Sequence, residues 1–334
     1  MDTTEIKANR KHFSRIGLVM FFGTLIIYAV QLLFSYIASK IPAVANNYDL
    51  YFVTAMLPTY IIAYPVIFLL FKKIPVQLTG EKKKMKPHHI LIAFLICYAV
   101  TYIGNYIGNT ITTIIGFFKQ SEVSNVVMNL TGQLSPVTTL LIVVIAAPIM
   151  EELLFRKFII DRTSKYGEGV AIVLSGLMFG LFHGNLGQFS YAFFLGIFFG
   201  FIYIKTRNIV YTIILHTIVN FLGSFVSMLL IDSSGYMELL ELLSSNAEIE
   251  TETLIAFFSE HAVGLIAFIL YYLCLIGFAI AGTILFFVNK RKFKLEPGEI
   301  VIEKGQRFKT IILNVGMILS CIFWIVMIIW QLIG

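Results

Sequence analysis

Long apolar stretches alternate with short polar segments along the whole chain. Nine such stretches cover residues 16–39, 49–71, 89–118, 137–160, 170–184, 190–204, 209–231, 262–289 and 310–333. Most are long enough, at ~1.5 Å per helical residue, to cross a bilayer core of ~30 Å. The pattern predicts an all-α, polytopic transmembrane helical bundle of nine spans, or of eight if 170–184 and 190–204 form a shallow pair. The first stretch exceeds the ~7–15 apolar residues of a signal peptide, so we expect it to remain as a helix.

The charged residues of the connecting segments indicate which span ends share a side. Lysine and arginine gather at the N-terminus and in residues 72–86, 156–165, 205–207 and 290–309. Nine spans with a cytoplasmic N-terminus place all of these on the cytoplasmic side, as the positive-inside rule requires. Residues 232–260, with seven acids and no Lys or Arg, then form an acidic extracytoplasmic loop. Within it, 236–243 predicts a short amphipathic helix at the membrane surface.

The composition agrees with a membrane protein and excludes other classes. The 334 residues are 58% hydrophobic and 13% charged, with a mean hydropathy of +0.86, whereas soluble domains average roughly 25% charged residues. No long soluble segment interrupts the spans, so we expect a single bundle over residues 1–334. The net charge of +6 lacks the aromatic-interleaved basic face of a nucleic-acid binder, so we expect contact with membrane lipids and no nucleic acid. The three isolated cysteines predict no disulfide framework and no metal site.

Small residues recur every four positions in three of the spans. The positions are Gly104 and Gly108; Gly176, Gly180 and Gly184; and Gly196 and Gly200. This spacing puts the small residues on one helix face, where a neighbouring helix can pack closely. Asn105 and Asn109, beside the first pair, either bond across helices or line a polar cavity.

One apolar run ends in ionisable residues, which are costly inside a membrane. Glu151, Glu152 and Arg156 follow the run 137–150. On a helix, Glu152 and Arg156 are four apart and share a face, so they predict an ion pair. Glu151 lies ~100° around the helix axis and is left free for chemistry. A Glu–Arg pair alone is more often structural, so a functional site needs further polar groups.

Two other spans supply such groups at matched spacing. Phe179 and His183 are four apart in one span, and His216 and Asn220 are four apart in another. Each pair therefore shares a helix face. A single histidine or asparagine in a span often only packs or joins helices. A glutamate, two histidines and an asparagine together are the set that intramembrane acid–base chemistry needs.

These three ordered motifs are similar to those of a known family. EExxxR is present as Glu151, Glu152 and Arg156, FxxxH as Phe179 and His183, and HxxxN as His216 and Asn220. In this order, each within an apolar helix, they resemble the CAAX-protease and bacteriocin-processing (CPBP or Abi) family of intramembrane endopeptidases, and its type II CAAX prenyl endopeptidases in particular. The similarity covers residues 137–225, which would be the catalytic core. It implies a helical bundle with a polar cavity open to the cytosol and the membrane.

The resemblance also implies a role for each residue. Glu151 and His183 would activate a water molecule, while His216 and Asn220 would stabilise the oxyanion. An oxyanion donor of this kind typically contributes ~2.7–4 kcal/mol. The remaining motif residues, Glu152, Arg156 and Phe179, would support the site, with Arg156 keeping Glu152 ionised or Glu152 orienting a neighbouring group.

The sequence leaves metal use and substrate open. Glu151, His183 and His216 would also suit zinc, but the HExxH helix of many zinc proteases is absent, and we expect no cofactor. Candidate substrates are a prenylated CAAX-type tail, a bacteriocin or signalling-peptide leader, and another membrane protein. By resemblance, we expect a bacterial plasma membrane.

Two other classes of protein remain as alternatives. The same cavity would serve a non-catalytic protein that binds a peptide, such as a bacteriocin self-immunity factor. A transporter that uses Glu151 as a proton site is disfavoured, because the chain shows no repeated half and no paired broken helices.

The expected span boundaries place the candidate residues at different depths. Glu151 lies nine residues, or ~13 Å, from the inner end of its span at residue 160. His183 lies about fifteen residues, or ~22 Å, from the start of its span. A strong tilt, or a helix that begins deeper in the membrane, is needed to bring the two side chains level.

Overall fold

A computed structural model describes residues 3–78, 80–124, 126–244 and 250–333, and every regular element in these ranges is a helix. Eight helical segments are long and apolar enough to cross a membrane. They are Thr4–Ser39 (in α1, Thr3–Ser39), Tyr48–Lys72 (α3 to α4), Pro87–Lys119 (α5), Pro136–Tyr166 (α7 to η4), Leu186–Thr206 (α11), Ile209–Ser233 (α12 to α13), Thr251–Lys292 (α15, Thr251–Asn289, and η6, Lys290–Lys292) and Val315–Ile333 (α17). A further apolar helix, α10 (Glu168–Phe182), is shorter. The chain is therefore an all-α, multi-pass membrane protein, as the sequence predicts.

Three of the spans contain π-helical pieces. The second contains α3 (Tyr48–Pro58), η1 (Thr59–Ala63) and α4 (Tyr64–Lys72). The fourth contains α7 (Pro136–Thr138), η2 (Thr139–Ala146), α8 (Ala147–Glu152), η3 (Leu153–Ile160), α9 (Asp161–Thr163) and η4 (Ser164–Tyr166). The one after α11 contains α12 (Ile209–Asn220), η5 (Phe221–Val226) and α13 (Ser227–Ser233). The π-helical pieces are η1, η2, η3 and η5. This geometry is rare in proteins overall, and where it occurs it is often at a functional site.

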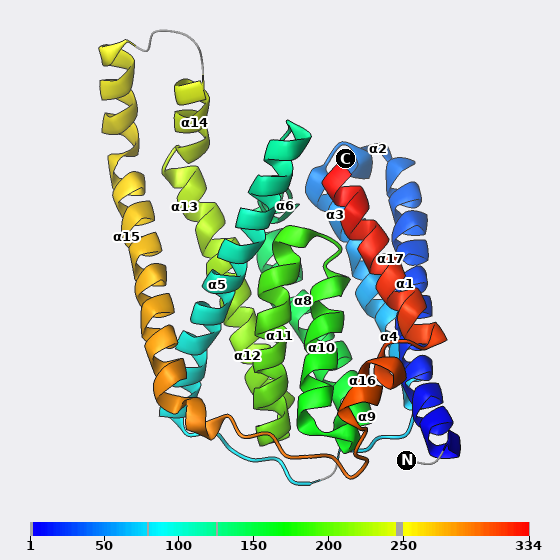
Figure 1. Ribbon diagram of the computed structural model, residues 1–334. Helices are drawn as coiled ribbons and strands as arrows, with labels where there is room; N and C mark the ends of the chain where they lie inside the picture. The colour runs from blue at the N-terminus through cyan, green and yellow to red at the C-terminus, as the bar shows by residue number, and fades with distance from the viewer. Residues whose placement is uncertain (1–2, 79, 125, 245–249, 334) are drawn as a thin grey trace.

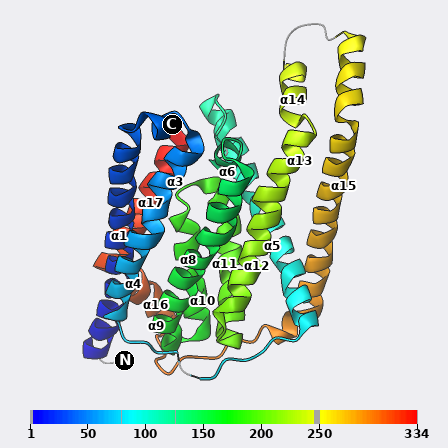
Figure 2. The same cartoon turned by 180° about the vertical axis from the view of Figure 1, so that it is seen from behind.

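The helices that carry the candidate residues lie in the middle of the bundle. In Figures 1 and 2, α8, α10, α11 and α12 stand between α1, α3 and α17 on one side and α5 and α15 on the other. The helix α5 packs on both α11 and α15, and α1 packs on α17. The motif-bearing helices are thus surrounded by the spans that carry no motif.

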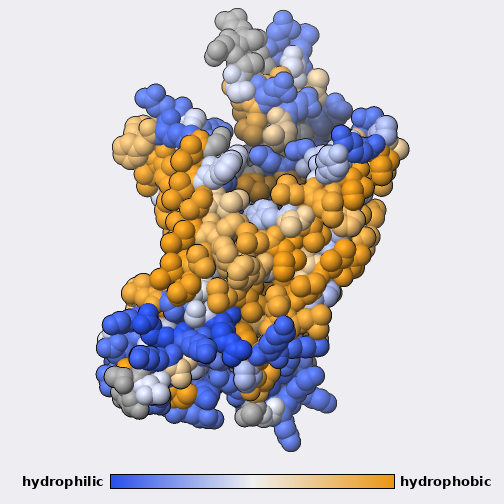
Figure 3. Space-filling model, turned by 90° about the vertical axis from the view of Figure 1, so that its right-hand side faces the viewer, coloured by the Kyte–Doolittle hydropathy of each residue, from blue (hydrophilic) through white to orange (hydrophobic). Residues whose placement is uncertain are grey.

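The basic connecting segments gather at the end of the bundle that holds the N-terminus, while the C-terminus lies at the other end (Figure 1). The segment between α4 and α5 donates backbone hydrogen bonds to the carbonyls of Asp161 and Thr206, and the segment between α15 and α16 (Lys304–Ile311) donates one to Lys165. Figure 3 shows an apolar belt between this polar end and the opposite one. The basic segments thus share one side of the belt, as the charge pattern predicts.

The helices α10 and α11 form a hairpin that does not reach the far end of the bundle. With 15 residues, α10 is ~22 Å long, and the turn that follows it lies well below the upper ends of α3 and α5 in Figure 1. Gly184 in this turn has a φ of +64°, a conformation that glycine adopts without a steric penalty. The structure thus has eight candidate spans, with α10 too short to be counted among them.

The expected inner end of the fourth span, at residue 160, is wrong. The helix continues to Tyr166, so Glu151 lies 15 residues from the inner end (166 − 151), and His183 lies 15 residues after the start of α10 at Glu168 (183 − 168). Both positions are ~22 Å along their helices, so the two side chains are level without strong tilt. Arg162 resembled a loop residue in the sequence, but it is buried and donates to the carbonyls of residues 71 and 74.

The predicted acidic loop is also mostly helical. The short helix expected over 236–243 is present as α14 (Tyr236–Ser244), and α15 begins at Thr251, well before residue 262. In Figures 1 and 2, α14 continues upward from α13 and runs beside the upper part of α15. The ring of Tyr236 stacks on that of Phe268 in α15, with centroids 5.4 Å apart. Glu248, one of the seven acids, lies outside the described residues.

Two further boundaries shift, and short helices fill the connections. The helix α1 includes most of the polar N-terminal segment, and the last span starts at Val315 because Thr310 belongs to α16. The remaining short helices are α2 (Pro42–Ala45) and α6 (Val126–Thr131). The three cysteines are free thiols, as predicted.

The glycine positions bring helix backbones into contact, as their spacing predicts. A Cβ atom added at Gly104 in α5 would lie 2.4 Å from the Cα of Tyr191 in α11, and one added at Gly196 would lie 3.0 Å from the Cα of Gly176 in α10. Such approaches exclude any side chain. Among the described hydrogen bonds, the side chains of Asn105 and Asn109 make none across helices, so the glycines alone account for this packing.

Candidate active site

Glu152 lies at the centre of a chain of charged contacts. One carboxylate oxygen, Oε2, is 3.0 Å from Nε of Arg156, and the other, Oε1, is 3.0 Å from Nδ1 of His216. The side chains of Glu152 and Arg156 are both fully buried. The ion pair expected from the four-residue spacing forms, and the same carboxylate fixes the orientation of a candidate histidine. Burial of these charges is tolerated because each has a partner.

The ring of Phe179 packs against the guanidinium of Arg156 and against both candidate histidines. The guanidinium of Arg156 lies over the Phe179 ring, 4.6 Å from its centroid, where a cation–π interaction stabilises the charge. The ring edges of His183 and His216 approach the same phenylalanine, with centroids 4.9 and 5.6 Å away. Phe179 therefore packs against three of the other motif residues at once.

Glu151 differs from its neighbour in exposure. Its side chain is 17% exposed, whereas that of Glu152 is 0% exposed. Oε2 of Glu151 lies 3.6 Å from Nε2 of His216, so this histidine stands between the two carboxylates. Glu151 is thus the accessible acid of the pair.

His183 caps the end of α10 with one ring nitrogen directed at the backbone. Its Nδ1 lies 2.8 Å from the carbonyl oxygen of Phe179. A carbonyl only accepts hydrogen bonds, so Nδ1 carries a proton, and in the neutral ring Nε2 keeps its lone pair. His183 also lies close enough to His216 and Arg156 to interact with them electrostatically. The structure therefore places His183 in the same cluster with a nitrogen free to accept a proton.

Asn220 ends α12 one helical turn beyond His216. Its Nδ2 donates a hydrogen bond of 3.0 Å to the carbonyl of Val143 in η2. An asparagine amide has two N–H groups, so this contact uses one and leaves one. The bond ties α12 to the span that carries Glu151.

Three tyrosines near Glu151 carry no motif in the sequence. Tyr60 and Tyr64 from the second span, and Tyr191 from α11, lie close enough to Glu151 to interact electrostatically. The hydroxyl of Tyr191 accepts a hydrogen bond of 2.9 Å from Nε2 of Gln188. With 16 tyrosines in the chain, no signal in the sequence distinguishes these three.

The side chains do not form a ready metal site. Among the described residues, no group of three or more His, Cys, Asp and Glu side chains is arranged to hold a metal ion. Both ring nitrogens of His216 face carboxylates, and Nδ1 of His183 is bonded to a carbonyl. The set Glu151, His183 and His216 therefore does not fit zinc in this arrangement, and no step through a metal is derived.

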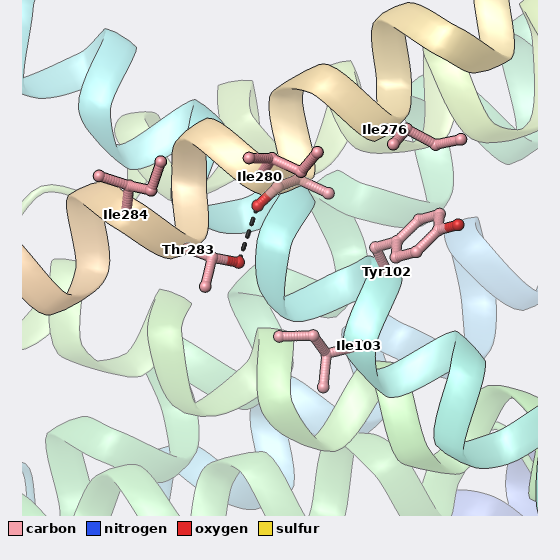
Figure 4. Close-up of a pocket in the computed structure, with 7 residues that line it drawn as sticks. Tyr102, Ile103, Ile276, Ile280, Thr283 and Ile284 are labelled. Carbon is pink, nitrogen blue, oxygen red and sulfur yellow. Dashed lines mark hydrogen bonds between the residues drawn. The ribbon is translucent and has the colours of Figure 1, made fainter.

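Two apolar surface hollows lie away from the cluster. One apolar groove lies between α5 and α15, lined by Tyr102, Ile103, Ile276, Ala279, Ile280, Thr283 and Ile284. Figure 4 shows it, with the Thr283 hydroxyl turned back to its own helix. A second lies between the ends of α5 and α17. Neither is lined by a motif residue, and neither is the polar cavity expected from the sequence.

The fold and the cluster together can be compared with known classes of membrane protein. Three intramembrane segments bring a partly exposed glutamate, two histidines and an asparagine together, with a buried Glu–Arg pair behind them. A family model described as "Type II CAAX prenyl endopeptidase Rce1-like" matches residues 133–222. These 90 of the 334 residues contain all three motifs. The match covers about a quarter of the chain, and over this segment the chain is similar to type II CAAX prenyl endopeptidases.

The other two comparisons give no relatives. No curated protein and no solved structure matches this chain. The similarity to that family therefore rests on the matched segment and its motifs.

Proposed function

We propose that this protein is an endopeptidase that hydrolyses a peptide bond within the membrane, using a water molecule activated by Glu151 and His183. The observation that carries the proposal is the contact of His216 with Glu151, together with the packing of His183 and His216 against the same Phe179 ring. Acid–base groups in contact, with one carboxylate partly exposed, are what such hydrolysis requires. The family match supports the same class of reaction.

In the proposed first step, the water oxygen attacks the carbonyl carbon of the peptide bond. The carboxylate of Glu151 takes the proton that the water loses, and the free Nε2 of His183 accepts the hydrogen bond of the second O–H. A carbon–oxygen bond forms, and the π electrons of the carbonyl move to its oxygen. Holding the water between two acceptors orients its lone pair toward the substrate.

In the second step, the tetrahedral intermediate collapses. His216 and the remaining N–H of Asn220 donate hydrogen bonds to the oxyanion, and each such donor is typically worth ~2.7–4 kcal/mol. The carbon–nitrogen bond then breaks, and Glu151 returns its proton to the leaving amine. In this scheme His216 carries a proton on each ring nitrogen, so Nδ1–H donates to Glu152 and Nε2–H donates to the oxyanion. The buried Glu152–Arg156 pair keeps the ring in place.

We propose a prenylated CAAX-type tail as the first substrate to test, with leader peptides and membrane-anchored proteins as further candidates. The shared position of the basic segments supports a cytoplasmic N-terminus under the positive-inside rule. A bacterial plasma membrane is the location we propose. The oligomeric state has no part in this scheme, since all proposed groups come from one chain.

The decisive experiment compares wild type and Glu151→Gln as purified protein in lipid nanodiscs. Both are incubated with a panel of farnesylated CAAX peptides, leader peptides and a membrane-anchored peptide, and products are read by mass spectrometry. We expect cleavage of at least one peptide by wild type and a loss of about 10³-fold or more in Glu151→Gln, the scale of losing a proton-transfer residue. Glu122→Gln, an exposed carboxylate outside the cluster, is the matched control and should cleave normally.

Two further outcomes separate the alternatives. Equal cleavage by wild type and Glu151→Gln would reject the proposed chemistry. Tight binding of a peptide without cleavage, unaffected by the substitution, would instead favour a non-catalytic peptide-binding protein such as a self-immunity factor.

The absence of a cofactor is a separate proposal with its own test. Active protein is dialysed against a strong chelator, and its metal content and cleavage rate are measured together. We expect an unchanged rate in metal-depleted protein. Loss of activity that returns on adding zinc would show that the side chains rearrange into a ligand set.

A further inference from the structure

The hydrogen bond between Asn220 and Val143 has a cause in the backbone of the fourth span. In the π-helical segment η2, the N–H of Ala147 donates to the carbonyl of Ile142, five residues earlier. The next residue along is Pro148, which has no N–H. In this register its partner would be the carbonyl of Val143 (148 − 5). That carbonyl is therefore left without a backbone donor.

A side chain from another helix supplies the hydrogen-bond donor that this carbonyl lacks. Nδ2 of Asn220 donates to it at 3.0 Å, a normal hydrogen-bond length. A carbonyl only accepts, so the nitrogen side of the amide, and not its oxygen, must face Val143. The contact thus fixes which end of the Asn220 amide points toward η2.

We propose that Pro148 is a positioning residue for Asn220: by withholding a backbone N–H from Val143, it creates the acceptor that fixes the asparagine amide and aims the second N–H at the oxyanion. The two N–H groups of a planar amide diverge from one nitrogen, so holding one fixes the direction of the other. An unpaired carbonyl within the membrane costs several kcal/mol, so the Asn220 contact is also strongly favoured. The inference rests on the proposed function, because it assigns the oxyanion role to Asn220.

The second span provides an internal control for this arrangement. There the N–H of Tyr64 donates to the carbonyl of Thr59, five residues earlier, and Pro65 follows directly. The carbonyl left free is that of Tyr60 (65 − 5), and the described hydrogen bonds include no side-chain donor to it. The same proline-after-π geometry therefore occurs near Glu151 without a positioned amide.

The test uses whole protein in nanodiscs with whichever peptide of the panel the wild type cleaves. Pro148→Ala restores an N–H that competes for Val143, and we expect kcat to fall about tenfold or more while KM stays within twofold. A misplacement near 1 Å can cost as much as 10²-fold. The apparent Tm should not fall, because alanine suits a helix better than proline. A purely structural proline would leave kcat unchanged under the same conditions.

A double-mutant cycle identifies the route of the effect. We expect Asn220→Ala to lower kcat by about 10²–10³-fold, and Pro148→Ala to cause no further loss in that background, because coupled residues are non-additive. Pro65→Ala, which repairs the equivalent gap in the second span, should leave kcat within twofold of wild type.

Three results would overturn the inference. They are full kcat in Pro148→Ala, an equal loss from Pro148→Ala with and without Asn220, and a loss in Pro65→Ala as large as that in Pro148→Ala. In each case inactive Glu151→Gln would leave the proposed function standing. Active Glu151→Gln would remove the proposed function itself.

Discussion

The spans α11 and α15 are built for opposite surroundings. Of the eight candidate spans, α11 is the least apolar and the most buried, while the span of α15 is the most apolar and the least buried. In a soluble protein the most apolar segment would be the most buried. In a bilayer the lipid-facing helix is the most apolar, and the interior packs through small and polar residues. In this bundle, low hydropathy therefore marks a span that packs in the interior.

The largest effect should come from breaking the charged contacts of the interior. Arg156→Ala leaves Glu152 as a buried charge without its cation, and removing one partner of a buried pair typically costs about 3–5 kcal/mol. We expect a corresponding loss in the free energy of unfolding, measured by denaturant titration in mixed micelles. Arg291→Ala, an exposed residue at the end of the α15 span, should change it by less than about 0.5 kcal/mol. Equal stability of the two variants would mean that Glu152 finds another partner.

Substituting one glycine in the interior and one in α15 should give a smaller effect, with the same side chain added at both places. A Cβ at Gly176 in α10 would lie 3.0 Å from the backbone nitrogen of Ile197, whereas nothing lies within 4 Å of a Cβ at Gly277 in α15. Gly176→Val should therefore destabilise the protein by about 1–3 kcal/mol through overpacking. The measurement is the same denaturant titration.

Gly277→Val is the control for that substitution. It adds the same side chain to open space at the lipid surface, so we expect no loss of stability. A destabilisation as large as that of Gly176→Val would show that α15 packs against something this single chain does not include. An unchanged Gly176→Val would show that α10 and α11 separate easily.

The part of the site that the sequence predicted is the part set by helix periodicity. A spacing of four put Glu152 beside Arg156 and predicted that Glu151 stays outside the pair, and both features are present. Hydropathy and charge predicted the spans and the common side of the basic segments. These features depend on neighbours along the chain, so one sequence is enough to read them.

The features that were missed depend on contacts between distant segments. The depth of Glu151 was misjudged because Arg162 looked like a loop residue, although carbonyls at and just after the end of the second span satisfy it in the interior. The acidic segment was taken for a loop because its packing against α15 leaves no periodic signal. The link from Asn220 to Val143 depends on a π-helical register, which no residue pattern announces.

The smallest expected effect concerns Tyr191, which lies on α11 near Glu151. Its hydroxyl accepts a hydrogen bond from Gln188, and this leaves its own O–H free to donate toward the carboxylate. We expect Tyr191→Phe to lower kcat between about twofold and tenfold with little change in KM, the range of one hydrogen bond worth ~0.5–1.5 kcal/mol. Steady-state cleavage of the panel peptide measures both constants.

A second tyrosine on the same helix decides whether that loss is local to the site. The hydroxyl of Tyr203 is also buried and donates to Asp161 at 2.7 Å, but it lies 12 residues further along α11 (203 − 191). Tyr203→Phe removes a comparable hydrogen bond, so it should cost similar stability and leave kcat unchanged. If both variants lose kcat equally, the effect comes from loosening α11 as a whole, and the buried span acts as one rigid support. If only Tyr191→Phe does, the interior of this bundle divides into residues that hold the helices and residues that act on Glu151.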